Sequence, residues 1–417
     1  MSDGFELLAK RRILTIVRIL VLSPYLPYPP HSGGRIRILE LLRFLQPRHE
    51  ITVVAFAIHE RELLQVEGLS KYCERVVAVP REKPIIADDD PRPQRIAEFS
   101  TAEMRETLLL LNEKYSFDLI DIEHIFMAQY APLIKAPAIL QEHNIESQLL
   151  KRYAELSQDY QGGKPKIYTP SEQFRDARTE WIKMAAYEAI EWPNFPVRVT
   201  VSDLDREEML KRCPGGRVVT IPNGVDTRSL LPVGYSDSAG VLFTGGMFYQ
   251  PNLDAAFELC DLIWPLVLKQ VPEACLYIVG REPPTELLAR QKPGQVEIIS
   301  DAPDLIPYAT KCCLSVVPLK VGGGTRLKIL ISMSLGLPVV STSVGCEGLE
   351  LKNEDELLVA DEPVQFAQKI VYLLQHKDKR ILLARTGRTI VETRYEWQHI
   401  FSKLENLFEE VAAFPYR

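Results

Sequence analysis

The sequence has 417 residues, of which 46% are hydrophobic and 25% are charged, and its formal net charge is −7. These values are ordinary for a folded globular protein and provide no global basic field, so nucleic acid is not an expected partner. The length is sufficient for two domains, each with its own core. The seven cysteines form no CxxC pair and no metal-ligand pattern with histidine, which favours reduced thiols in a cytoplasmic protein.

The chain begins with a segment that combines apolar and basic side chains at residues 5–12. Two interpretations stay open: a leader helix packed on the protein surface, or a basic amphipathic helix that weakly contacts the inner face of a membrane. The apolar run at residues 13–22 contains Arg18 and is too short to span a bilayer, so we expect the first core strand there instead.

Strand and helix patterns then alternate, which predicts an α/β protein with parallel sheets covered by helices on both faces. The strands predicted for the first half are residues 19–23, 51–57, 75–79, 119–123, 138–142 and 198–202. Helical periodicity predicts helices at residues 34–45, 101–114 and 172–190, and residues 81–97 and 159–170 read as loops.

A Cys-Pro-Gly-Gly sequence at residues 213–216 reads as a hinge, so we expect one Rossmann-like domain over residues 1–214 and another over residues 215–393. Strands predicted after the hinge are residues 218–221, 240–244, 275–279, 296–299, 313–317 and 338–341. Residues 394–417 are expected to complete the first domain, with a helix whose apolar face carries Trp397, Phe401, Leu404 and Phe408. A ligand would lie in the crevice between the carboxyl ends of the two sheets.

Residues 322–328, Gly-Gly-Gly-Thr-Arg-Leu-Lys, are the most informative segment. The glycines Gly322, Gly323 and Gly324 let backbone N–H groups approach a ligand, and Thr325 is a predicted N-cap of the helix that follows. Arg326 and Lys328 add two charges to the positive end of that helix, which suits a phosphate or diphosphate. Gly336 is the expected end of the helix.

Several short motifs occur in the order and spacing of one known family. Residues 23–24 and 29–34 follow the first strand, residues 142–144 read Glu-His-Asn, and residues 201–203 read Val-Ser-Asp. Residues 221–226 then read Ile-Pro-Asn-Gly-Val-Asp, residues 243–246 read Phe-Thr-Gly-Gly, and the glycine segment follows. Over most of its length the chain resembles a retaining glycosyltransferase of family 4 with the GT-B fold, which implies two facing Rossmann-like domains and a C-terminal helix that crosses back to the first.

The resemblance implies transfer of a hexose-type sugar from a nucleotide diphosphate, UDP- or GDP-linked, to a glycan or lipid-linked acceptor in cell-surface polysaccharide assembly. It implies no cofactor and no metal, so protein groups must stabilise the leaving diphosphate. Relatives carry an Arg and a Lys after the strand that ends at Gly245 and Gly246, where this chain has none. Arg326 and Lys328 are therefore expected to contribute more to stabilising the charge of the leaving diphosphate.

Further site residues follow from the same alignment. Gly33 and Gly34 match the glycine turn on the acceptor side, where a helix N-terminus approaches phosphate or acceptor. Asn223 matches the nucleotide cleft, and His143 is expected beside the reacting sugar, where imidazole can bond a hydroxyl or manage a proton. Glu123 ends the preceding strand and is expected on the acceptor side. The alternative interpretations are purely structural: Gly33, Gly34 and Asn223 would form ordinary tight turns, and His143 would stabilise the fold without contacting a substrate.

Ile331 departs from the pattern, because the resemblance implies a ribose-binding glutamate at this position. Glu347 or Glu350 could substitute as the acceptor, the nucleotide preference could be altered, or the enzyme could be degenerate. The alternatives to a transferase are therefore a protein that binds nucleotide sugar or a partner without turnover, and a nucleotide-sugar epimerase of the same fold.

Overall fold

The computed structural model describes residues 16–81, 86–87, 89–159 and 176–413. The predicted basic helix at residues 5–12 and most of the predicted loop at residues 159–170 lie outside the described residues. No helix in these described ranges is both long enough and apolar enough to cross a membrane.

The first domain is built on a seven-stranded sheet in the order β3-β2-β1-β4-β5-β6-β7, in which every neighbouring pair is parallel. Burial on both faces explains the continuous apolar runs in its central strands. The strands are β1 (Arg18–Ser23), β2 (Glu50–Ala57), β3 (Arg75–Pro80), β4 (Leu119–Glu123), β5 (Ala138–Glu142), β6 (Val197–Thr200) and β7 (Arg217–Thr220).

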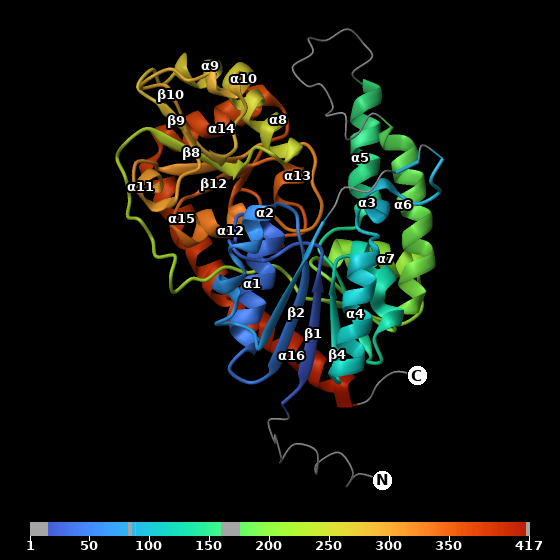
Figure 1. Ribbon diagram of the computed structural model, residues 1–417. Coiled ribbons are helices and arrows are strands. Elements are labelled where there is room, and N and C mark those ends of the chain that lie inside the picture. Colours follow the sequence, from blue (N-terminus) through green and yellow to red (C-terminus); the bar gives the residue numbers. More distant parts are fainter. Residues whose placement is uncertain (1–15, 82–85, 88, 160–175, 414–417) are drawn as a thin grey trace, which may run out of the picture.

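Helices cover both faces of this sheet (Figure 1). They are α1 (Gly33–Leu45), α2 (Glu60–Leu63), α3 (Gln94–Glu98), α4 (Ala102–Lys114), α5 (Glu146–Asp159), α6 (Ala177–Glu191) and α7 (Asp203–Arg212). Short 3₁₀ segments lie at Val66–Leu69, Ile125–Leu133 and Trp192–Asn194. The predicted loop at residues 81–97 therefore contains the start of a helix, because α3 begins at Gln94.

The second domain has a six-stranded parallel sheet in the order β10-β9-β8-β11-β12-β13. Its strands are β8 (Gly240–Gly246), β9 (Cys275–Arg281), β10 (Val296–Ser300), β11 (Leu314–Val317), β12 (Val339–Ser341) and β13 (Leu358–Val359). The helices are α8 (Gln250–Glu258), α9 (Trp264–Leu268), α10 (Thr285–Leu288), α11 (Ile306–Ala309), α12 (Leu327–Ser334), α13 (Ser343–Cys346), α14 (Pro363–Gln375) and α15 (Lys377–Arg394), with a π turn at Leu259–Ile263 between α8 and α9.

The predicted boundary at residues 214 and 215 is wrong by one strand. β7 pairs with β6 in the first sheet, from Val197 opposite Arg217 to Thr200 opposite Thr220. The Pro-Gly-Gly turn before β7 therefore connects two elements of one domain, and the passage to the second sheet comes after Thr220 and before Gly240. A glycine-rich turn can join a helix to a strand as readily as it can separate domains.

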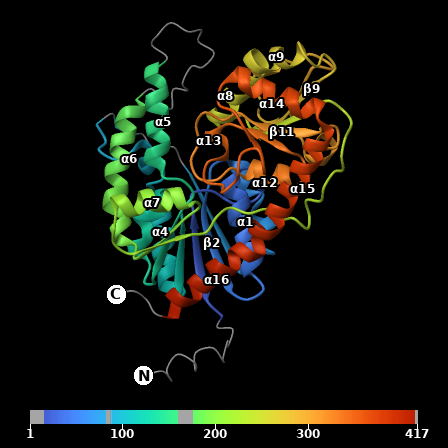
Figure 2. The ribbon, with the colours of Figure 1, turned by 180° about the vertical axis from the view of Figure 1, so that it is seen from behind.

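The C-terminal helix α16 (Trp397–Ala413) returns to the first domain, as predicted (Figure 2). Trp397, Phe401, Leu404 and Phe408 are all buried on its apolar face. Phe401 stacks on Trp397 with ring centroids 4.6 Å apart and contacts Phe44 of α1 at 5.8 Å. This packing attaches the end of the chain to the domain in which the chain began.

Both sheets have a point where the strand order reverses, between β1 and β4 in the first and between β8 and β11 in the second. Loops that leave two adjacent strands in opposite directions open a crevice at the carboxyl ends of those strands. The site described below lies at these two reversal points.

Candidate active site between the domains

A cavity of about 390 Å³ lies between the two domains. Its wall on the first domain comes from the loops after β1, β4 and β5, and its wall on the second domain comes from the end of β8, the loop after β11 and helix α12. Of the residues predicted for the site, the cavity is lined by Gly33, Gly34, His143, Asn223, Gly245, Gly246, Gly322, Gly323, Thr325, Arg326, Lys328 and Ile331. All but two of the predicted site residues therefore line one cavity, and they make up about half of its lining.

The glycine segment approaches the first domain so closely that side chains would not fit. A Cβ atom on Gly323 would lie 2.9 Å from Oδ1 of Asn144, and one on Gly324 would lie 2.3 Å from the backbone oxygen of His143. Gly324 also has φ of +60°, which favours glycine. Gly324 does not line this cavity, contrary to the prediction, because it packs beneath the backbone of His143.

The predicted N-cap at Thr325 is wrong. Helix α12 begins at Leu327, and Arg326 occupies the cap position without a capping hydrogen bond from its side chain. The Thr325 hydroxyl instead accepts a hydrogen bond of 2.8 Å from Nδ2 of Asn223. The predicted end of this helix at Gly336 is confirmed, since Gly336 follows α12 with φ of +71°.

Arg326 is buried, and its guanidinium group mainly braces the glycine loop. Nη1 donates to the backbone oxygens of Gly323 and Gly324, and Nη2 donates to that of Val344 at 3.1 Å. Because three carbonyl groups already use these donors, Arg326 offers less to a bound anion than the sequence predicted. Its charge still lies at the wall of the cavity.

Lys328 lies on the first turn of α12 and faces the same cavity. Its Nζ donates to Oδ1 of Asn252 at 2.6 Å and lies 4.8 Å from the ring centroid of Phe243. Burial lowers the pKa of this ammonium to about 7, and the charge of Arg326 acts in the same direction. No carboxylate lines the cavity in the described part of the chain, so a bound anion would be the counter-ion that Lys328 lacks.

The wall on the first domain carries His143, whose Nε2 lies 2.5 Å from Oε2 of Glu123. Burial is the main reason why the pKa of His143 lies well below its usual value, so the ring is neutral. Burial also raises the pKa of Glu123 to about 7, against the opposing effect of the Arg37 charge. Glu123 is fully buried behind the imidazole and does not line the cavity, so its predicted place on the acceptor side is corrected to a partner of His143.

A buried polar network extends from Glu123 to the other domain. Gln141 donates to Oε1 of Glu123 at 3.2 Å and to Oδ1 of Asp121 at 2.7 Å, and it accepts from Nη2 of Arg37 at 3.0 Å. Nη1 of Arg37 donates to Oδ1 of Asn223 at 3.2 Å, and Asn223 in turn donates to the glycine loop at Thr325. The two walls of the cavity are thus linked by hydrogen bonds through Asn223.

Arg37, Asp121 and Gln141, which the sequence analysis missed, are buried behind the lining of the cavity and support it. The sequence did contain an indication of buried polar contacts at Asp121 and Glu123. These two residues alternate with Ile120 and Ile122 in a strand that is buried on both faces. Two carboxylates on one face of such a strand need partners, because an unpaired buried charge is strongly destabilising. Nothing in the local sequence pattern identified Arg37 as the nearby positive charge, because Arg37 lies in helix α1, far from β4 in the sequence.

Gly33 and Gly34 open α1 at the edge of the cavity, as predicted. A Cβ atom on Gly34 would lie 1.9 Å from the hydroxyl oxygen of Tyr25 and 3.2 Å from Nδ1 of His143, while one on Gly33 would lie 3.4 Å from Cδ1 of Leu327. The glycine turn therefore leaves room for His143 and Tyr25 at the mouth of the site.

Comparison with known proteins assigns both domains. A family model described as "Glycosyltransferase Family 4" matches residues 31–229, and one described as "Glycosyl transferases group 1" matches residues 238–376. The chain is a family 4-type glycosyltransferase with the GT-B fold. The break between the two matches falls after β7, where the structure also places the passage between the sheets.

The relatives of this glycosyltransferase cover almost its whole length. A Klebsiella pneumoniae protein described as an uncharacterized 44.6 kDa protein in the cps region is 23% identical over 93% of this chain and 99% of its own length. HepE of Anabaena, solved in complex with UDP and glucose, is 14% identical with a TM-score of 0.64 over 94% of this chain and 100% of that chain. Sucrose-phosphate synthase of Thermosynechococcus elongatus is 16% identical with a TM-score of 0.69, over 95% of this chain and 99% of that chain. These structural likenesses show the GT-B fold.

Ile331 lines the cavity of the glycosyltransferase one helical turn beyond Lys328. Neither substitute carboxylate suggested by the sequence reaches it. Glu347 is held by Arg152 on the other side of the glycine loop, and Glu350 is not among the residues that line the cavity. The apolar position is therefore left without a substitute carboxylate in the described structure.

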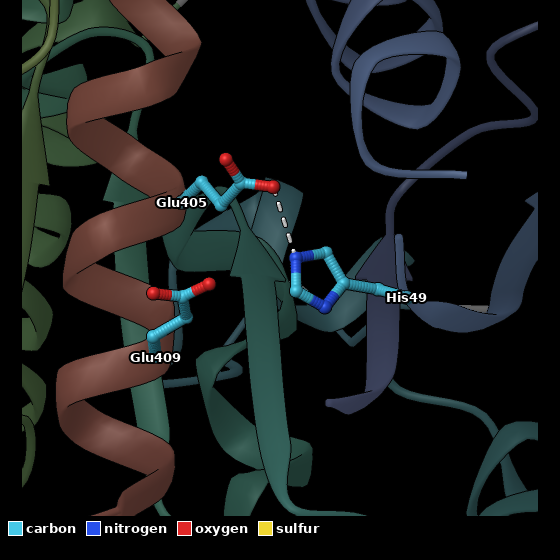
Figure 3. Close-up of side chains that lie close together, drawn as sticks. All are labelled: His49, Glu405 and Glu409. Carbon is cyan, nitrogen blue, oxygen red and sulfur yellow. Dashed lines mark hydrogen bonds and ion pairs between the residues drawn. The ribbon is translucent and has the colours of Figure 1, made fainter. Parts of the chain in front are cut away.

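His49, Glu405 and Glu409 lie close together where α16 crosses the first domain (Figure 3). Three such side chains can hold a metal ion in principle, but here His49 and Glu405 are engaged with each other and with other groups of the protein. Nδ1 of His49 accepts from the backbone N–H of Val17 at 3.2 Å, so Nε2 carries a proton and donates it to Glu405 at 3.0 Å. Arg48 also donates to Glu405 at 2.5 Å. The arrangement is an ion-pair contact that attaches the C-terminal helix.

Proposed function

We propose that this glycosyltransferase moves a hexose-type sugar, with retained configuration, from a UDP- or GDP-linked donor to a glycan or lipid-linked acceptor. The observation that carries the proposal is the interdomain cavity, whose second-domain wall offers glycine-loop amides and Lys328 while His143 lies opposite. The solved complex of HepE with UDP and glucose supports a UDP-linked donor. The relative from a cps region supports a role in cell-surface polysaccharide assembly, and we place the reaction in the cytoplasm.

Each wall has a distinct part in the proposed reaction. When the bond between the sugar C1 and the diphosphate oxygen breaks, its electron pair stays on the diphosphate. The acceptor hydroxyl oxygen bonds to C1 on the face that the diphosphate leaves, and the proton of that hydroxyl passes to the released diphosphate oxygen. Lys328 and the amides of the glycine loop stabilise that developing charge without a bound metal. His143, neutral and oriented by Glu123, bonds a hydroxyl of the transferred sugar from the opposite wall.

The test begins with ligand binding, because the donor base is unknown. A thermal-shift panel of UDP, GDP, ADP and their sugars at millimolar concentration should raise the melting temperature with the cognate nucleotide, since the shift grows with ligand concentration over its Kd. Release of free nucleoside diphosphate that depends on an added acceptor would then establish transfer. A panel without any shift would contradict the proposal.

A second candidate, binding of nucleotide sugar without turnover, is favoured by one observation, the apolar Ile331 on the cavity wall. It predicts a thermal shift with no release of nucleoside diphosphate. The epimerase alternative needs acid and base carboxylates at the sugar, and the described lining of the cavity has none. Interconversion of sugars in the absence of an acceptor would be required to revive it.

A further inference from the structure

The first domain reaches across to the glycine loop of the second through its helical hairpin, α5 and α6. Figure 1 shows these two helices rising from the first domain beside the second. Val321, the residue before the glycines, is buried in a small apolar cluster whose other members belong to the hairpin: Leu149, Tyr153 and Ala154 of α5, and Ala177 of α6. The loop that lines the donor cavity is thus held by apolar contacts from the opposite domain.

Arg152, on the same face of α5, adds a polar contact at the same place. Its Nη1 donates to the backbone oxygen of Gly322 at 2.6 Å and to Oε2 of Glu347 at 2.6 Å, and its Nη2 donates to Oε1 of Glu347 at 2.8 Å. A bidentate pair of this kind fixes geometry as well as adding energy. Glu347 belongs to the second domain, directly after α13, so the pair joins the two domains.

The glycine loop is therefore braced from two sides. Within its own domain Arg326 holds the oxygens of Gly323 and Gly324, and from the other domain Arg152 holds the oxygen of Gly322. Three consecutive glycines have much conformational freedom, so the direction of their N–H groups depends on such contacts. The contact from Arg152 exists only while the domains are close enough for α5 to touch the loop.

We infer that Arg152 is a positioning residue that couples closure of the two domains to formation of the anion-binding loop. This inference rests on the proposed donor site. In the closed arrangement Arg152 fixes Gly322, and the loop amides are presented to the diphosphate. When the domains separate, Gly322 loses this donor and the loop relaxes, so a nucleotide diphosphate binds the closed form more tightly and stabilises it. Loss of Arg152 lowers the fraction of competent protein and weakens apparent binding in proportion.

The experiment compares the affinity for UDP, measured by calorimetry, among variants of the full chain. Arg152→Ala should weaken binding about tenfold, within the usual range for coupling between sites. Lys151→Ala is the matched control, because Lys151 lies on the same helix and pairs with the exposed Glu155, so its affinity should be unchanged. Arg152→Lys should retain part of the affinity.

A charge reversal separates positioning from a general effect on folding. Arg152→Glu alone should bind UDP more weakly than Arg152→Ala, and Arg152→Glu combined with Glu347→Arg should recover part of the loss, with melting temperatures close to that of the wild type. Equal affinity of wild type and Arg152→Ala would overturn the inference and leave the proposed function intact. Failure of the wild type to bind UDP, GDP or ADP would instead remove the proposed donor site, and the inference with it.

Discussion

The two walls of the interdomain cavity solve different problems with different kinds of structure. The second-domain wall takes its glycine loop and Lys328 from one contiguous segment, residues 322–331, which lies beside the end of β8, and the described lining of this wall has no carboxylate. The first-domain wall is assembled from the ends of β4 and β5 and from α1, and hides Asp121 and Glu123 behind His143. The comparison indicates that the second-domain wall is suited to bind a negatively charged group, whereas the first-domain wall orients the neutral imidazole of His143.

Of the substitutions considered, Lys328→Met should have the largest effect on turnover, because it removes the cation of the second-domain wall. Methionine preserves the apolar length of the side chain but removes the cation whose partners are Asn252 and the proposed diphosphate. Loss of one group that stabilises developing charge costs about 10²- to 10³-fold in turnover. The measurement is kcat with the cognate donor, alongside the melting temperature. A variant that is folded and still turns over at the wild-type rate would show that the anion is not bound at this wall.

Ile331→Glu tests whether the second-domain wall lacks a group that binds the donor. A carboxylate hydrogen bond to the nucleotide contributes about 1.5–3 kcal/mol, so affinity for the nucleotide should rise about 10- to 150-fold. Ile331→Gln is the matched control, because it has the same reach without the charge and should gain less. Calorimetry gives both values. If Ile331→Glu binds more weakly than the wild type, the carboxylate pairs with Lys328 one turn away, or the nucleotide lies elsewhere.

The contrast between the walls also explains what the sequence could predict. The glycine loop and Lys328 of the second-domain wall were predicted because glycines, cations and helix follow one another in the chain. Most strands were placed within a few residues. The boundary near residue 214 was misplaced because pairing of β7 with β6 is a tertiary choice that local pattern does not contain. Arg37 was missed for the same reason, since its partners Gln141 and Asn223 are distant in sequence. The turn of Arg326 toward backbone oxygens depends on how the loop folds over it.

The pH dependence of donor affinity distinguishes the walls by their titrating groups. The pKa of Lys328 is lowered to about 7 in the free protein, so its charge is present below that pH and is lost as the pH rises through it. A bound diphosphate favours the charged form, so affinity for the nucleotide sugar should fall by about 15-fold between pH 7 and about pH 8.5. Lys328→Arg should flatten this profile, because arginine stays charged. A wild-type profile as flat as that of the arginine variant would argue against a lowered pKa.

Glu123→Gln should have a smaller effect, confined to turnover and not to donor affinity. The pKa of Glu123 is raised to about 7, so the carboxylate that accepts from Nε2 of His143 is present above that pH and is lost as the pH falls through it. We therefore expect kcat at saturating donor to decline toward acid pH in the wild type. Glutamine keeps an acceptor of similar size but cannot titrate, so kcat above pH 7 should fall only about fivefold, the equivalent of about 1 kcal/mol, and the acid decline should disappear. If the decline persists in Glu123→Gln, it belongs to another group, and the orientation of His143 does not depend on the charge of this carboxylate.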